Sequence, residues 1–132
     1  MKIQEQVLSI EQMKHLQDLG VDTSDASMCW LDFEDNEPME VAVFVPQIML
    51  GYATCKIYPT DTIGDLMEKL PKHFYVRESP ISMVALNGSG AFQVWYDEVP
   101  KSGKSDGTIK SAFYKLLCWV AEKHKELLEV KK

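Results

Sequence analysis

The last part of the chain is one long amphipathic segment, and this segment limits the folds open to the whole sequence. The segment spans about residues 109–128, and its apolar residues recur at helical spacing in one broad stripe: Ile109, Ala112, Phe113, Leu116, Leu117, Val120 and Ala121. A helix with such a stripe buries it against another layer of secondary structure. The remainder of the 132 residues must supply that layer.

Two shorter helices are predicted from their capping residues. Ser9 and Gln12 have the spacing of a capping box in front of a helix over about residues 10–19, and Gly20 provides its stop. Thr62 caps a second helix of about two turns, which Pro71 ends.

The segments between the helices have the alternation and turn residues of β-strands. Strands are predicted over residues 28–33, 39–45, 52–57, 73–77, 81–87 and 91–98. The first two should pair antiparallel, the last two form a hairpin around "GSG", and residues 99–108 read as a flexible loop. The sequence therefore predicts one α+β domain, residues 1–132, in which a mainly antiparallel sheet of about four to six strands packs in a two-layer or three-layer sandwich. Its helices are the long C-terminal one and the two shorter ones.

Targeting and cysteine signals point to the cytoplasm. The first residues have no apolar core of a secretory signal, and the longest apolar run, residues 41–53, is too short for a membrane span and is interrupted by Pro46. The cysteines, Cys29, Cys55 and Cys118, are odd in number and lie among apolar neighbours, which is typical of reduced, buried thiols.

Charge is distributed unevenly along the chain. Residues 1–66 hold 12 acidic and 3 basic side chains, whereas residues 67–132 hold 8 acidic and 11 basic ones. Between Lys14 and Lys56 there are eight acids and no Lys or Arg. This segment is either a solvated face balanced by the basic half of the fold, or a docking surface for a basic partner or a second copy. A pI near 5.0 argues against nucleic-acid binding.

Six residues are the candidate partner-binding residues. They are the acids of the run "DFEDNE" and two tryptophans, one on a strand and one beside the stripe of the last helix: Asp32, Glu34, Asp35, Glu37, Trp95 and Trp119. Alternation puts Phe92, Val94 and Tyr96 on one face of a strand and Trp95 on the other, so a large ring remains on whichever face the helices leave open. Burial of both tryptophans is the alternative.

No catalytic, metal or cofactor motif is present. The histidines and cysteines are too dispersed for a zinc site, and "DFEDNE" lacks the ordered spacing and the glycine of a calcium loop. "SGKS" in the loop 99–108 lacks the upstream glycine of a phosphate-binding loop, because Val99 occupies that position. A thiol nucleophile at Cys29 or Cys118 would need a histidine from elsewhere in the fold.

Three stretches resemble recurring elements of small uncharacterised bacterial proteins associated with prophages and mobile elements. They are "LSIEQMKHLQDLGVDTSDASMCW", "DTIGDLMEKLP" and "IKSAFYKLLCWVAEKH". The resemblance implies a bacterial or phage origin and a sandwich-like domain, and it brings no functional residues with it.

Three functions are compatible with these features. The first is a non-catalytic interaction or accessory module that binds a protein partner or a second copy. The second is an enzyme with a pocket around Asp32, Glu34, Cys29 or His73. The third is an acidic mimic of nucleic acid, which would need two rows of acids at phosphate-like spacing.

Overall fold

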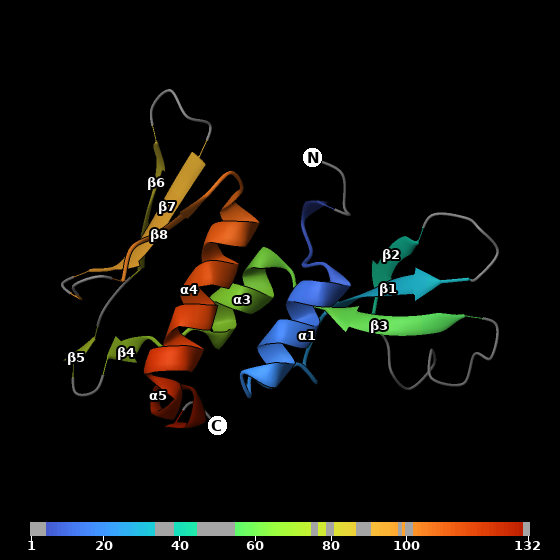
Figure 1. Ribbon diagram of the computed structural model, residues 1–132, viewed down its shortest axis with the longest axis horizontal. Coiled ribbons are helices and arrows are strands. Elements are labelled where there is room, and N and C mark those ends of the chain that lie inside the picture. The colour runs from blue at the N-terminus through green and yellow to red at the C-terminus, as the bar shows by residue number, and fades with distance from the viewer. Residues whose placement is uncertain are drawn as a thin grey trace.

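In the part of the chain that the structure describes, helices lie in the middle of the molecule with a three-stranded sheet at either end (Figure 1). The computed structural model describes residues 5–33, 39–44, 55–74, 77–78, 81–86, 91–97, 99 and 102–130. The helices are α1 (Ile10–Asp18), α3 (Ile63–Lys69), α4 (Ile109–Lys123) and α5 (Lys125–Val130).

The described strands form three small antiparallel sheets. The first sheet has the order β2-β1-β3, with β1 (Met28–Asp32), β2 (Glu40–Val43) and β3 (Lys56–Thr60). The second pairs β4 (His73–Phe74) with β5 (Arg77–Glu78). The third has the order β6-β7-β8, with β6 (Ile81–Leu86), β7 (Ala91–Tyr96) and β8 (Lys104–Asp106).

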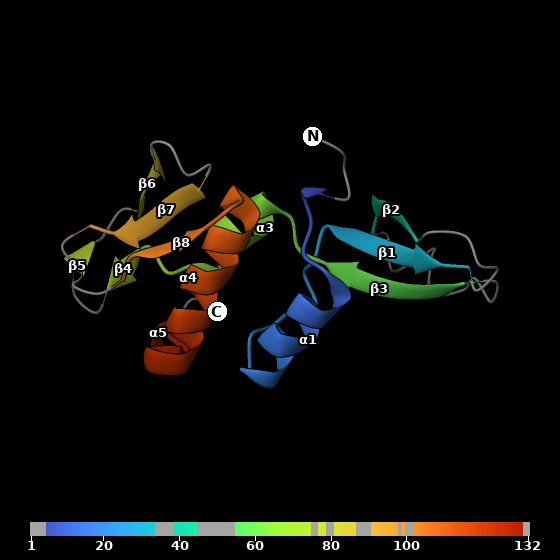
Figure 2. The ribbon, with the colours of Figure 1, turned by 45° about the horizontal axis from the view of Figure 1, so that its top comes forward.

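The predicted α+β class is confirmed, as is the antiparallel pairing of the first two strands. The described strands do not join in one sheet. Helix α3 begins soon after β3, and it leads the chain away from the first sheet into the helices. Among the described strands, those after α3 pair with one another and not with the first sheet (Figure 2).

Four segments differ from the prediction. The segment 73–77 is divided between β4 and β5, and the loop 99–108 contains β8, which pairs with β7. Of the predicted strand 52–57, residues 52–54 lie outside the described residues, and β3 begins at Lys56. The long C-terminal helix is interrupted at His124, whose φ of -139° and ψ of 42° leave the helical region.

Capping residues fix the helix ends where the sequence indicates them. Ser9 Oγ accepts a hydrogen bond from the Gln12 amide at 3.1 Å, and the Gln12 side chain accepts one from the Ser9 amide at 2.9 Å. Gly20 ends α1 with a φ of 89°, and an added Cβ there would lie 2.6 Å from Lys125 Nζ. The end of α1 is thus packed against α5.

The apolar core lies among the helices and one face of β7. The stripe of α4 is buried as predicted, and it packs with Leu16 of α1, Leu66 of α3, and Val94 and Tyr96 of β7. Tyr96 is fully buried, and its hydroxyl donates to the Pro71 carbonyl at 2.8 Å. Among the described helices, none has the length and apolar character needed to cross a membrane.

Candidate functional site

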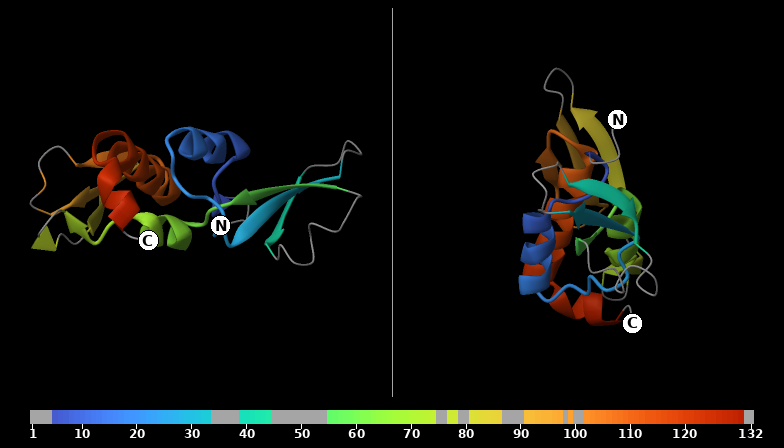
Figure 3. Two further views of the ribbon diagram at one scale, coloured as in Figure 1. Left: turned by 90° about the horizontal axis from the view of Figure 1, so that it is seen from below. Right: turned by 90° about the vertical axis from the view of Figure 1, so that its right-hand side faces the viewer.

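The β2-β1-β3 sheet, which we call the sheet arm, extends away from the helices (Figure 3). The main apolar cluster contains residues from α1, α3, β7 and α4, and none from the described residues of β1, β2 or β3. The arm is anchored to the body of the molecule at its base, where β3 meets α1, and at Trp30 of β1, whose Nε1 donates to the Leu8 carbonyl at 2.9 Å. The arm is therefore a projecting surface that the core of the protein does not cover.

Both faces of the arm carry apolar side chains that remain partly accessible. The register places Trp30 between Val41 and Tyr58 on one face, and Leu31 between Glu40 and Ile57 on the other. All of these side chains are half-buried except that of Glu40, which is exposed. Half-buried faces of this kind are more similar to the apolar patches of interaction surfaces than to a fully buried core.

Exposed apolar residues are concentrated in the arm. Four large apolar side chains are exposed in the described residues, and three of them lie in or beside β1 and β2: Phe33, Met39 and Val43. Val43, at the end of β2, is 62% exposed, and the fourth, Met67 on α3, is 51% exposed. Scattered exposed apolar residues are common, whereas their concentration on one projecting element indicates a contact surface.

The outer edge of β2 is open in the described structure. The Phe44 amide donates to the Ser27 carbonyl at 3.0 Å, so residues 44, 42 and 40 direct their backbone groups toward β1. Backbone groups alternate in an antiparallel pair, and those of Val41 and Val43 therefore point away from β1. No described strand pairs with this side of β2.

The opposite edge of the sheet is blocked near Pro59. The outward positions of β3 are Ile57 and Pro59, and Pro59 has no amide hydrogen to offer an additional strand. Just beyond, the Leu8 amide donates to the Asp61 carbonyl at 3.0 Å, and Val7 forms a bridge with Thr62. The two edges of the arm thus differ, and β2 is the edge able to accept a strand.

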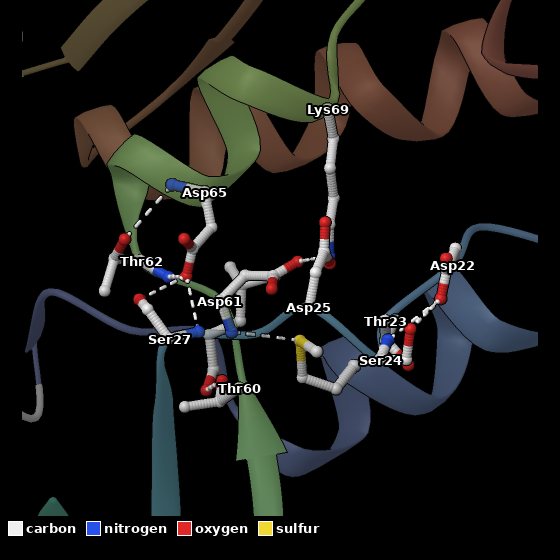
Figure 4. A network of polar contacts seen from close by, with 12 residues as sticks. Asp22, Thr23, Ser24, Asp25, Ser27, Thr60, Asp61, Thr62, Asp65 and Lys69 are labelled. Carbon is white, nitrogen blue, oxygen red and sulfur yellow. Dashed lines mark hydrogen bonds and ion pairs between the residues drawn. The ribbon is translucent and has the colours of Figure 1, made fainter. Parts of the chain in front are cut away.

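A cluster of hydrogen bonds and ion pairs connects the base of the arm to α3 (Figure 4). Lys69 of α3 donates to Asp61 Oδ2 at 2.6 Å and contacts Asp25 Oδ1 at 3.1 Å. Asp65 accepts hydrogen bonds from the Ser27 amide at 3.1 Å and the Ser27 hydroxyl at 2.6 Å. Because Asp25 and Ser27 precede β1 while Asp61 follows β3, one short helix holds both strands at their base.

Burial and hydrogen bonding act on the two acids of this cluster in opposite directions. Burial raises the pKa of the Asp61 carboxyl, and its ion pair with Lys69 opposes that shift. Asp65 is partly buried, yet its hydrogen bonds from Ser27 and Thr62 outweigh the burial and lower its pKa. Asp61 Oδ1 is buried and accepts no hydrogen bond in the described structure, which makes the ion pair with Lys69 the main compensation for the buried charge.

The geometry of the cluster suits a structural role, in which it holds the ends of β1 and β3 against α3. Lys69 is 8% exposed, and its ammonium is engaged by two carboxylates, so it offers no free amine for chemistry. Within the described residues, no group of three or more His, Cys, Asp or Glu side chains is arranged to hold a metal ion.

The described candidate partner-binding residues lie at different places in the molecule. Asp32 ends β1 and lies opposite Lys56 of β3, whereas Trp95 is on β7 in the sheet at the other end of the molecule (Figure 1). Trp119 lies on α4, half-buried, with the His124 ring 4.9 Å away and Lys104 Nζ 5.4 Å from its centroid. Glu34, Asp35 and Glu37 lie outside the described residues. The candidate tryptophans therefore do not join Asp32 in a common surface.

The suggested pocket residues are also apart. Cys29 is buried in β1, where burial raises its thiol pKa, and His73 is in β4 beyond the helices (Figure 1). Burial also raises the pKa of Cys118, to about 11, and both thiols are therefore poor nucleophiles.

Sequence reasoning overlooked Val41, Val43, Asp61 and Lys69. Two features of the sequence indicate them. Pro59 within a strand marks that strand as an edge of the sheet, and Lys69 lies three residues after Leu66, on the apolar side of its helix.

No protein family matches the chain, and neither a curated protein nor a solved structure is significantly similar to it. The resemblance to prophage-associated proteins stays a prediction.

Proposed function

We propose that the protein is a non-catalytic, cytoplasmic protein–protein interaction module and that the sheet arm is its docking surface. The observation that carries this proposal is the concentration of exposed apolar side chains, with Val43 the most exposed, on an element outside the core. A surface of this kind gains free energy when a partner covers it.

The charge of the arm supports a basic partner. The chain between Lys14 and Lys56 includes all of β1 and β2 and holds eight acids and no Lys or Arg, and of these acids Asp25 contacts Lys69 of α3. Opposite charge on a partner would accelerate association and make the affinity fall as salt increases. The acid Asp32 and the acid Glu40 lie on opposite faces of the arm, which does not favour the two-row pattern of a nucleic-acid mimic.

A matched pair of substitutions tests the arm as the docking surface. Val43→Ser removes an exposed apolar side chain from the arm, and Met67→Ser removes one from α3. We expect Val43→Ser to weaken binding of a captured partner about tenfold, the effect of one buried valine, and Met67→Ser to leave it unchanged. The measurement is affinity capture from the native cells at low and moderate salt, with titration of the partner once it is identified by mass spectrometry.

Two results would contradict the proposal. One is a complex that survives Val43→Ser but not Met67→Ser, which would move the docking surface to α3. The other is the absence of any captured protein at either salt concentration.

A further inference from the structure

The open edge of β2 has the properties of a receptor for one more strand. We infer that the sheet arm binds an extended, basic segment of another protein, which adds beside β2 as a fourth strand of the sheet. This inference rests on the proposed function, and it specifies the backbone groups that make the contact and the chemistry of the partner.

The backbone groups required for strand addition are in place. Val41 and Val43 each direct one amide hydrogen and one carbonyl away from β1. A segment laid along β2 can exchange hydrogen bonds with both residues, which is the usual way in which a peptide extends a sheet. Because Pro59 has no amide hydrogen and the Asp61 carbonyl accepts from Leu8, β2 offers more outward amide hydrogens than β3 in the described sheet.

The side chains of β2 favour a partner strand in which apolar and basic residues alternate. Val41 and Val43 lie on the face of the arm that also bears Trp30 and Tyr58, and Glu40 is exposed on the other face. A strand beside β2 places successive side chains on these two faces. Apolar residues of the partner would therefore lie beside Val41 and Val43, and its Lys or Arg residues would lie on the side of Glu40.

Charge disfavours a second copy as the occupant. A second copy has the same net charge of -6 and would bring another exposed Glu40 to the edge of β2. Like charges across a strand pair are destabilising, whereas a basic segment would neutralise this charge.

Synthetic peptides provide a direct test on the full chain. The probe is an eight-residue peptide that alternates lysine and valine, labelled for fluorescence anisotropy. The first control is the same length of alternating glutamate and valine. The second is the lysine peptide with N-methyl groups on alternate backbone nitrogens, which keeps the charge and removes donors for a strand pair.

Two variants of the protein separate backbone from side chain. Val43→Pro removes an amide hydrogen that points outward and leaves the pairing with β1 in place, as Pro59 does on the opposite edge. Val43→Ala keeps this hydrogen and shortens the side chain. Circular dichroism and thermal unfolding of both variants establish that the arm and the body remain folded.

We expect the lysine peptide to bind the wild type and to bind the Val43→Ala variant within a few-fold. We expect at least tenfold weaker binding to Val43→Pro, and to the wild type when the peptide is N-methylated. The glutamate peptide should not bind.

Equal affinity of the methylated and unmethylated peptides would overturn strand addition, as would a folded Val43→Pro variant that binds as well as Val43→Ala. A stable dimer of the free protein that Val43→Pro dissociates would overturn the choice of a basic partner. If strand addition fails while Val43→Ser still weakens the captured complex, the docking surface stands and only its mode of binding is wrong.

Discussion

Replacement of Lys69 by methionine is expected to lower the free energy of unfolding by about 3–5 kcal/mol, because it leaves the buried carboxylate of Asp61 without its partner. The loss should be measured by urea unfolding near pH 7. Lys72→Met is the matched control, since Lys72 lies on the surface three residues further along and should change stability by less than about 0.5 kcal/mol.

The same variant has a predicted pH dependence. Burial already raises the pKa of Asp61 above its ordinary value of 3.8, and loss of the Lys69 ammonium, which opposes this shift, should raise it further. A carboxyl whose pKa is higher in the folded state destabilises the fold as pH rises from about 4 through that raised pKa. The difference in stability between wild type and Lys69→Met should therefore shrink as the pH is lowered toward 4.

A double-mutant cycle tests whether Asp61 and Lys69 stabilise the fold as a pair. The variant that carries both Asp61→Asn and Lys69→Met has no buried charge at this site. Its loss of free energy of unfolding should therefore be smaller than the sum of the losses in the two single variants. Strictly additive losses would show that the ion pair does not hold the base of the arm.

The second large effect is expected in the core of the body. Leu116 is fully buried in the stripe of α4, and Leu116→Ala should cost about 2–5 kcal/mol, the transfer free energy of the lost atoms plus the cavity that they leave. Val43→Ala, on the exposed edge of the arm, should cost less than about 0.5 kcal/mol. Both are measured by denaturant unfolding with linear extrapolation.

The contrast between these two variants matters for function. If stability resides in the helices and β7, residues of the arm can be changed without unfolding the protein, and losses of binding there report on the surface itself. A cost of Val43→Ala comparable with that of Leu116→Ala would show instead that the arm is part of the core.

Local features of the fold could be predicted from the sequence because neighbouring residues determine them. The capping boxes at Ser9 and Thr62, the stop at Gly20 and the apolar stripe of α4 each depend on a few adjacent side chains. The alternation that buries Val94 and Tyr96 and leaves Trp95 half-buried is local in the same sense.

The partition of the strands into separate sheets could not be predicted, because it depends on contacts between distant segments. Alternation identifies a strand but not its neighbour, and β8 pairs with β7 although its sequence reads as a loop. The same limit applied to the site. The acidic run indicates Asp32 and strand alternation indicates Trp95, and their placement at opposite ends of the molecule (Figure 1) follows from the route of the chain through α3.

The measurement that tests the central claim most directly is amide hydrogen exchange at Val41 and Val43, recorded by NMR in the free protein and with a saturating amount of the lysine–valine peptide. In the free protein both amides should exchange faster than the Phe44 amide, which is bonded to Ser27, and the peptide should slow both of them. Protection of Val41 and Val43 already in the free protein, or no change when the peptide is bound, would contradict an open edge that receives a strand.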